Sequence, residues 1–197
     1  MLKHKITNYK DIVMVGKVFK QGGINLLYGE SGLGKTVSTI KALNDDEIEP
    51  ILLDFDENLS PEQSDCKFIH IDGNKFMKDE EAIVPENQTI IVDTWQIYSL
   101  CGGSYELLAR MKSNSNTVIV IAHNKDIATK TDIPDIDSRI ANHMDAKLFM
   151  EYDKGNKSKT NNRDEGPKLT VKKLRGYTGS RTIYNWMRDD CNMIPQH

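Results

Sequence analysis

The chain has 197 residues, a formal net charge of −3 at pH 7, and three widely spaced cysteines outside any CxxC pair (Cys66, Cys101 and Cys191). These features exclude a disulfide framework and a cysteine-based zinc site. No apolar run reaches the length of a membrane helix, about 18 residues, and no signal-peptide pattern is present. We therefore expect a soluble, cytoplasmic protein of one domain with a substantial core.

Charge is unevenly distributed along the chain. Residues 44–62 carry eight carboxylates and no Lys or Arg, whereas residues 154–188 carry ten Lys or Arg against two carboxylates. A basic end on an acidic protein suits a localised anionic partner, although a solvated tail is the simpler interpretation of the charge alone.

The first predicted elements are a strand at 24–28, a glycine-rich loop, and a helix at 35–43. Residues 29–36 read GESGLGKT, a complete GxxxxGKT phosphate-binding loop. Its glycines let backbone N–H groups approach phosphates, Lys35 reaches the β- and γ-phosphates, and the Thr36 hydroxyl binds Mg²⁺. We predict a nucleotide site made of Gly29, Glu30, Ser31, Gly32, Leu33, Gly34, Lys35, Thr36 and Val37.

A second strand is predicted at 50–55, and it ends in several carboxylates. A carboxylate at a strand end can act as a general base toward the water that attacks a phosphate. Asp56 and Glu57 are the candidates, and Asp54 is a candidate for fixing the local turn. A solvated acidic loop is the alternative, and spacing does not choose between the adjacent acids.

The next elements are a strand at 67–71, a helix at 78–82, and an apolar strand at 89–93 that ends in Asp93. This last strand has the form of a Walker B strand, whose acid holds Mg²⁺ across from Thr36. The pattern alone is weak because many buried strands end in Asp, but it lies downstream of a complete phosphate loop.

Gly102 and Gly103 precede a predicted helix at 105–113, which Ser104 can cap. A strand at 117–123 follows and ends at His123, which could contact the γ-phosphate. A lone histidine at a strand end is, by itself, more often structural.

The rest of the chain combines polar segments with three further strands. Residues 124–143 are polar, residues 153–166 are expected to form a mobile loop, and strands are expected at 146–152, 167–173 and 182–187. Continuous apolar strands alternating with helices predict an α/β fold with a mostly parallel, twisted sheet flanked by helices. The last strands are expected to form an antiparallel hairpin at its edge.

The order of these motifs resembles the RecA/DnaB class of P-loop ATPases over roughly residues 20–187. The segment at 52–61 resembles the one that carries the catalytic glutamate of that class, with Asp56 at the glutamate position and Glu57 beside it. The strand ending in Asp93 and Thr94 resembles its Walker B strand, and the strand ending in His123 resembles its γ-phosphate sensor strand. The resemblance implies one RecA-like domain over 1–197, with an N-terminal extension at 1–20, that binds ATP and Mg²⁺.

Residues 173–179, KLRGYTG, resemble the Lys-x-Arg hairpin of DnaB-like helicases and are one residue shorter across the turn. In that family the two cations reach the nucleotide of a neighbouring subunit, so the resemblance implies a ring or filament of identical chains in which Lys173 and Arg175 act in catalysis. An ordinary basic surface hairpin is the alternative.

The loop after the sensor strand binds single-stranded DNA in the same family. Lys125, Lys130 and Arg139 are the corresponding candidates for salt-dependent phosphate contacts, and no aromatic residue between 124 and 143 offers base stacking. The chain resembles a bare motor core of the kind found in phage- or plasmid-encoded RepA-type helicases and short single-strand-annealing proteins. The resemblance therefore implies partners among DNA replication or recombination proteins.

Three functions are compatible with these features. The first is a DNA-stimulated helicase or translocase ATPase, and the second is an ATP-switched recombination mediator or annealing protein without unwinding. The third is a P-loop small-molecule kinase, which the basic hairpin and the absence of a recognisable arginine-rich lid disfavour.

Overall fold

The computed structural model describes residues 12–57, 59, 65–79, 85–125, 132–152, 167–177 and 181–183. Within these ranges, an eight-stranded sheet has the order β10-β9-β8-β3-β7-β6-β4-β5. The predicted α/β fold with a mostly parallel sheet and a C-terminal antiparallel hairpin is confirmed, since β9 pairs antiparallel with β8 and β10 antiparallel with β9. No helix in the described part is both long and apolar enough to cross a membrane.

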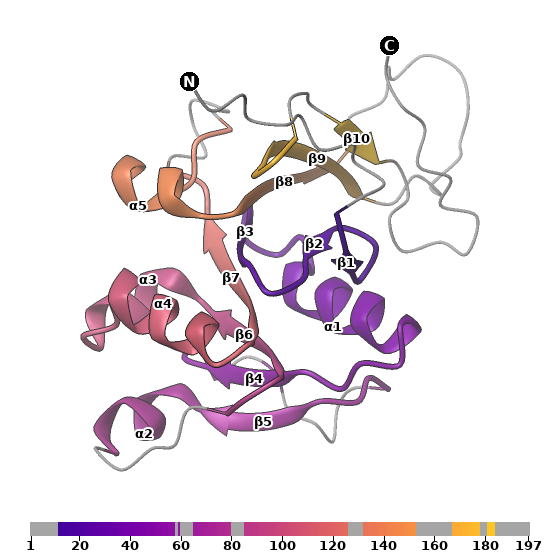
Figure 1. Cartoon of the computed structure of the whole chain (residues 1–197). Coiled ribbons are helices and arrows are strands. Elements are labelled where there is room, and N and C mark those ends of the chain that lie inside the picture. Colours follow the sequence, from indigo (N-terminus) through magenta and orange to yellow (C-terminus); the bar gives the residue numbers. More distant parts are fainter. Residues whose placement is uncertain are drawn as a thin grey trace, which may run out of the picture.

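The elements alternate along the chain (Figure 1). The strands are β1 (Met14–Val15), β2 (Phe19–Lys20), β3 (Ile24–Gly29), β4 (Ile51–Asp54), β5 (Ile69–Asp72), β6 (Thr89–Asp93), β7 (Thr117–His123), β8 (Ala146–Tyr152), β9 (Pro167–Leu174) and β10 (Arg181–Ile183). The helices are α1 (Lys35–Asp45), α2 (Gly73–Lys78), α3 (Trp95–Leu100), α4 (Tyr105–Ser113) and α5 (Ser138–His143).

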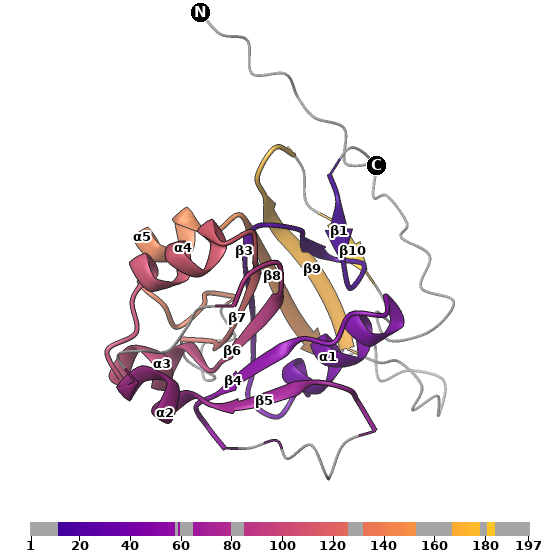
Figure 2. The same cartoon turned by 60° about the horizontal axis from the view of Figure 1, so that its bottom comes forward.

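Two buried clusters cover the two faces of the sheet. On one face, Ile40 and Leu43 of α1 and Phe19 of β2 pack against alternate strand residues such as Leu52 and Ile91. The other cluster joins α3, α4 and α5 to the intervening residues, including Leu53 and Val92. Figure 2 shows α1 on one side of the sheet and α3, α4 and α5 on the other. The central strands are buried on both faces, which explains their continuous apolar sequences.

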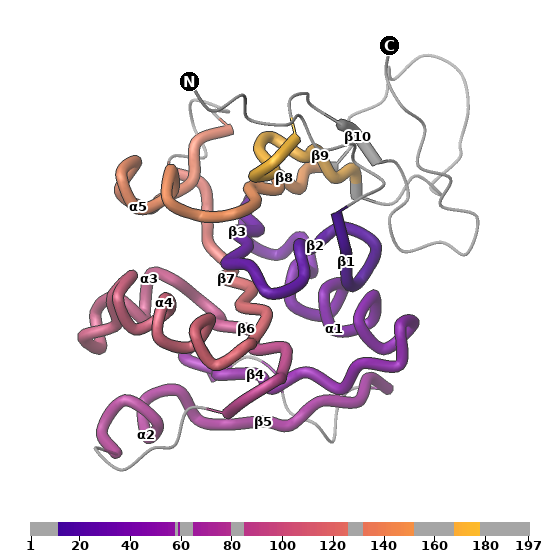
Figure 3. The backbone as a smooth tube through the Cα atoms, viewed as in Figure 1, coloured from indigo at the N-terminus to yellow at the C-terminus, as the bar shows by residue number. Residues whose placement is uncertain are grey.

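Strand order brings distant parts of the chain together. Figure 3 shows β3, from the start of the chain, beside β8, from its later half. β3 pairs in parallel with both β8 and β7, so β7 separates the phosphate-loop strand from β6. The carboxyl ends of β3, β7, β6 and β4 therefore meet along one edge of the sheet.

Of the helix predicted at 78–82, residues 80–82 lie outside the described residues, and Asp79 is not helical. The observed helix, α2, ends at Lys78 and begins at Gly73, and the Asp72 carboxylate caps it by accepting the Lys75 N–H. The predicted helix at 105–113 is confirmed with its cap, since the Ser104 side chain accepts the Leu107 N–H at 3.3 Å. The predicted loop at 153–166 lies outside the described residues.

Candidate functional site

Alternation along the strands places two polar side chains on the same face. Leu52, Ile91 and Ile121 belong to the cluster on the α1 face. Because side chains alternate along a strand, the residues two positions after Ile91 and Ile121, which are Asp93 and His123, face α1 as well. In the register of the sheet, Gly29 lies opposite His123 and Asp93 lies opposite Ile121. The sequence thus directs polar side chains from neighbouring strand ends toward the phosphate loop.

The phosphate loop has the backbone conformation that its glycines allow. Gly32 and Gly34 have φ values of 77° and 72°, in the left-handed region that favours glycine. A Cβ on Gly29 would lie 2.3 Å from the Met150 carbonyl oxygen, so no larger residue fits there. The Lys35 ammonium folds back and donates to the carbonyl oxygens of Gly29 at 3.1 Å and Glu30 at 2.7 Å.

Lys35 is buried, with 5% of its surface exposed. Burial lowers its pKa to about 8, and the nearby Asp93 carboxylate opposes this shift. The ammonium is therefore held in a poorly solvated position where an added anion would stabilise its charge.

Thr36 and Asp93 form the second part of the site. The Thr36 hydroxyl donates to Asp93 Oδ2 at 2.6 Å, which joins the start of α1 to the end of β6. Burial raises the pKa of Asp93 to about 6; the Asp56 and Asp54 carboxylates act in the same direction, and the Thr36 hydrogen bond opposes it. A hydroxyl and a carboxylate are hard oxygen donors suited to Mg²⁺, which uses few protein ligands beside phosphates. The donor set therefore fits the predicted magnesium site.

The structure distinguishes the two neighbouring acids at the end of β4. Asp56 lines the phosphate-loop pocket and accepts a hydrogen bond from the Thr94 hydroxyl at 3.3 Å. Glu57 has a positive φ of 55° and lines a separate pocket with His70 and Asp72. Spacing in the sequence did not choose between Asp56 and Glu57 as the candidate general base. The geometry of the pocket favours Asp56.

Asp54 closes the turn that carries Asp56. Its buried carboxylate accepts the N–H groups of Glu57 at 2.9 Å and Leu59 at 3.4 Å. The imidazole of His70 lies 3.1 Å from the same carboxylate. The hypothesis that Asp54 fixes the local turn agrees with these contacts.

His123 lies at the edge of the pocket. Its Nδ1 is buried without a hydrogen-bond partner among the described residues. Burial lowers the pKa of His123, and Lys35 adds to this shift while Asp56 and Asp135 oppose it. The lowered pKa favours the neutral imidazole, and Nδ1 is a polar atom that a bound ligand or water could satisfy.

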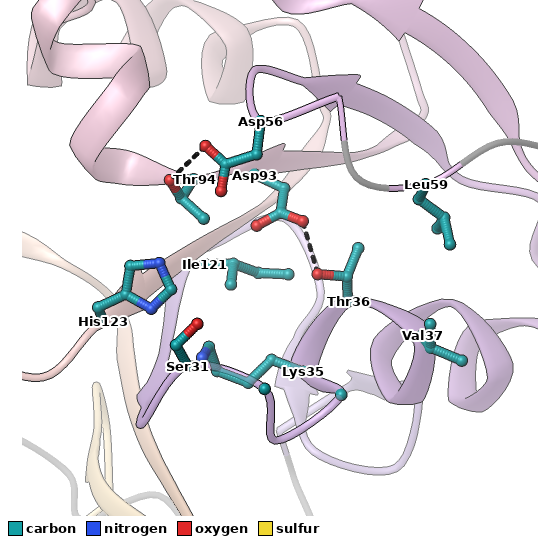
Figure 4. Close-up of a pocket in the computed structure, with 12 residues that line it drawn as sticks. Ser31, Lys35, Thr36, Val37, Asp56, Leu59, Asp93, Thr94, Ile121 and His123 are labelled. Atoms are coloured by element: carbon teal, nitrogen blue, oxygen red, sulfur yellow. Dashed lines mark hydrogen bonds between the residues drawn. The ribbon is translucent and has the colours of Figure 1, made fainter.

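These side chains surround one pocket with a volume of about 320 Å³ (Figure 4). The close-up shows Asp56 and Asp93 at the top of the pocket, His123 and Thr36 on opposite sides, and Lys35 below them. The described lining consists of Ser31, Gly32, Gly34, Lys35, Thr36, Val37, Asp56, Leu59, Asp93, Thr94, Ile121 and His123. Lys35 is the one Lys or Arg among these lining residues.

Lys173 and Arg175 do not join this pocket. In the register of the sheet, Lys173 lies opposite Lys147 near the start of β8. β3 runs parallel to β8, and the phosphate loop follows the other end of β3. The four residue-to-residue steps from Asn25 to Gly29 span roughly 13 Å along the strand. Lys173 and Arg175 therefore lie at the opposite, amino edge of the sheet.

Both cations have partners within the chain. Lys173 donates to the carbonyl oxygens of Asn142 and Met144 around the end of α5. Arg175 pairs with the Asp145 carboxylate at 3.2 Å and donates to the His143 carbonyl oxygen. The Asp145 side chain, 3% exposed, also binds Lys112 at 2.7 Å. These contacts give Lys173 and Arg175 a structural role beside any catalytic one.

The candidate DNA contacts lie along the chain that leaves β7. Lys125 is exposed, and its backbone N–H donates to the Ile133 carbonyl oxygen at 2.9 Å. Arg139 is 87% exposed and pairs with Asp137, which caps α5. Lys130 lies outside the described residues.

Three residues near the site were not predicted from the sequence. Thr94 binds Asp56, as described above. The Gln96 side chain accepts the backbone N–H of His123 at 3.4 Å and donates to the Asp135 carbonyl oxygen at 3.0 Å. These two contacts attach both ends of the loop after β7 to α3. The Tyr28 hydroxyl, directly before the phosphate loop, donates to the Asp132 carbonyl oxygen at 3.0 Å. The position of Thr94 next to the Walker B acid was the one sequence signal for any of them.

A scan against protein-family models found no match, and a search of curated proteins found no significantly similar sequence. The chemistry of the site is therefore what indicates a function for this protein.

Proposed function

We propose that this protein is an ATP hydrolase of the RecA/DnaB type that binds single-stranded DNA as a homo-oligomer and acts as a helicase or translocase in DNA replication or recombination. The observation that carries the proposal is the convergence of Lys35, Thr36, Asp56, Asp93 and His123 in one pocket. These residues come from the phosphate loop and from the ends of three other strands.

Each side chain has a definite part in the proposed reaction. Lys35 and the loop N–H groups bind the β- and γ-phosphates, and Thr36 and Asp93 would hold Mg²⁺, which would neutralise phosphate charge there. Asp56 accepts a proton from the attacking water as the new O–P bond forms and the bond between the γ-phosphorus and the bridging oxygen breaks, leaving ADP. His123, whose lowered pKa favours the neutral imidazole, contacts the γ-phosphate.

The negative charge on the γ-phosphate oxygens in the transition state requires a further cationic side chain besides Lys35. Lys35 is the one Lys or Arg in the described lining, and Arg175 of the same chain lies at the other edge of the sheet. An inserted arginine accelerates phosphoryl transfer by orders of magnitude. We assign this part to Arg175 and Lys173 of a neighbouring copy, which makes hydrolysis depend on assembly.

The loop after β7 supports a link between the nucleotide and DNA. It begins next to His123 and carries Lys125, and Gln96 and Tyr28 hold it against the elements that form the pocket. Loss of a γ-phosphate contact at His123 would therefore reach the start of the loop that carries Lys125. Phosphate contacts from Lys125, Lys130 and Arg139 would give binding that depends on salt and not on sequence.

The test measures ATP hydrolysis with and without single-stranded DNA, together with mass by light scattering in the presence of Mg²⁺ and an ATP analogue. We expect slow turnover in dilute protein and a rise with assembly and DNA, and Lys35→Ala should abolish both rates. A monomer that is indifferent to DNA would overturn the proposal. A tailed-duplex assay separates unwinding from the annealing or loading expected of a mediator, and phosphorylation of a small-molecule acceptor would indicate a kinase.

A further inference from the structure

We infer that Thr94 is a positioning residue that holds the Asp56 carboxylate in place for attack on the γ-phosphate. This inference rests on the proposed function, because it requires Asp56 to act on the attacking water. The Thr94 hydroxyl donates to Asp56 Oδ1 at 3.3 Å, and both residues line the phosphate-loop pocket. No other hydrogen-bond partner of the Asp56 carboxylate is found among the described residues.

The backbone around Thr94 is fixed. Thr94 is 4% exposed and directly follows Asp93, which binds Thr36. The Phe55 N–H donates to the Asp93 carbonyl oxygen at 2.6 Å, so the ends of β4 and β6 are joined by the main chain next to the side-chain contact. A donor fixed in this way has little freedom to lose when it binds, which makes it an effective orienting group.

Electrostatics explain why Asp56 needs such a donor. The Asp54 and Asp56 carboxylates lie close enough to Asp93 to disfavour its ionisation. Repulsion between these like charges favours conformations in which the partly buried Asp56 carboxylate turns away from Asp93, toward solvent. The Thr94 hydroxyl opposes that displacement and leaves Asp56 Oδ2 available to accept the water proton.

Two hydroxyl–carboxylate pairs therefore cross the pocket in adjacent positions. Thr36 with Asp93 joins α1 to β6, and Thr94 with Asp56 joins β6 to β4. Thr36 and Asp93 would hold the metal, and Thr94 would hold Asp56 toward the attacking water. Removal of the second hydroxyl should consequently affect the chemical step without affecting nucleotide binding.

The test is Thr94→Val, which removes the hydroxyl and keeps the shape. Assembled, DNA-stimulated protein should lose roughly ten- to a hundredfold in kcat, the range expected for a hydrogen bond to a charged group. KM and the affinity for an ATP analogue with Mg²⁺ should stay within about twofold, because ground-state binding does not use this hydrogen bond. Thr94→Ser should recover kcat to within about threefold of wild type, because it restores the donor.

Thr89→Val is the matched control, since Thr89 is a buried threonine at the far end of the same strand, β6. It should leave kcat unchanged. Thermal unfolding checks that each variant folds, and Thr94→Cys replaces Thr94→Val if the latter does not.

The outcomes separate this inference from the proposed function. Wild-type protein that does not hydrolyse ATP would overturn both. If wild type is active and Asp56→Asn is not, but Thr94→Val keeps full kcat, the inference alone fails. A loss of analogue affinity equal to the loss of kcat would also refute it, because Thr94 would then support binding and not the position of Asp56.

Discussion

Asp93→Asn should stabilise the ligand-free protein, even though the same change should destroy the proposed magnesium site. Asp93 is 7% exposed, and its pKa is raised from 3.8 to about 6, chiefly by burial. A buried ionised carboxylate destabilises the folded state, and asparagine removes the charge while keeping an oxygen that can accept from Thr36.

The magnitude follows from the difference in pKa between the folded and unfolded chain. A carboxyl group with a higher pKa when folded favours the folded state only while it is protonated, so its contribution is lost as the pH rises from about 4 to about 6. A difference of this size corresponds to roughly 2 to 3 kcal/mol at pH 7.5 and to about half of that at pH 5. The gain from Asp93→Asn should therefore be larger at the higher pH.

The assay is urea unfolding of both proteins in EDTA at pH 7.5 and pH 5, repeated at pH 7.5 with Mg²⁺ and an ATP analogue. With ligand, the order should reverse, because the analogue stabilises wild type by mass action and binds the variant poorly. A variant that is less stable than wild type in EDTA at pH 7.5 would refute the reasoning about buried charge. Asp79→Asn, a change to a carboxylate outside the described lining of the pocket, controls for the loss of one negative charge.

Other consequences concern single groups around the site. Because the pKa of ligand-free Lys35 is about 8, ATP affinity should fall as the pH rises from 7 to 9, and Lys35→Ala should remove that dependence in a binding titration. Gln96→Ala should raise hydrogen exchange at the Asp135 amide by roughly fivefold, because Gln96 holds both stems of the loop; unchanged exchange would mean the loop is held elsewhere. Ser104→Ala should cost about 1 kcal/mol of unfolding free energy, while Ser113→Ala at the other end of α4 should cost less.

Local chemistry made much of the fold predictable. Continuous apolar runs correspond to β3, β6 and β7, which are buried on both faces, and the Ser104 cap correctly marked the start of α4. The phosphate loop was identified because only glycine fits its left-handed positions and its approach to β8. These features depend on residues that are near one another in the chain.

The features that escaped prediction depend on tertiary contacts or on short elements. α3 and α5 each have six residues, too few to show a helical period, although Asp137 is a recognisable cap for α5. The choice between Asp56 and Glu57 required the direction in which β4 ends and the turn that Asp54 closes. The ion pair between Arg175 and Asp145 joins residues that only the sheet register brings together.

The positions of the two half-sites make subunit mixing the decisive test of assembly. The proposed nucleotide-binding residues lie at the carboxyl edge of the sheet and Arg175 at the amino edge, so a head-to-tail contact would bring them together and generate a ring or filament. Lys35→Ala and Arg175→Ala should each be inactive alone. In an equal mixture, about a quarter of the interfaces would pair an intact pocket with an intact Arg175, and activity should recover to about that fraction. Lys168→Ala, elsewhere on β9, should be active by itself. No recovery in co-assembled mixtures would show that Arg175 acts within its own chain, through Asp145 and α5, and not on a neighbour's nucleotide.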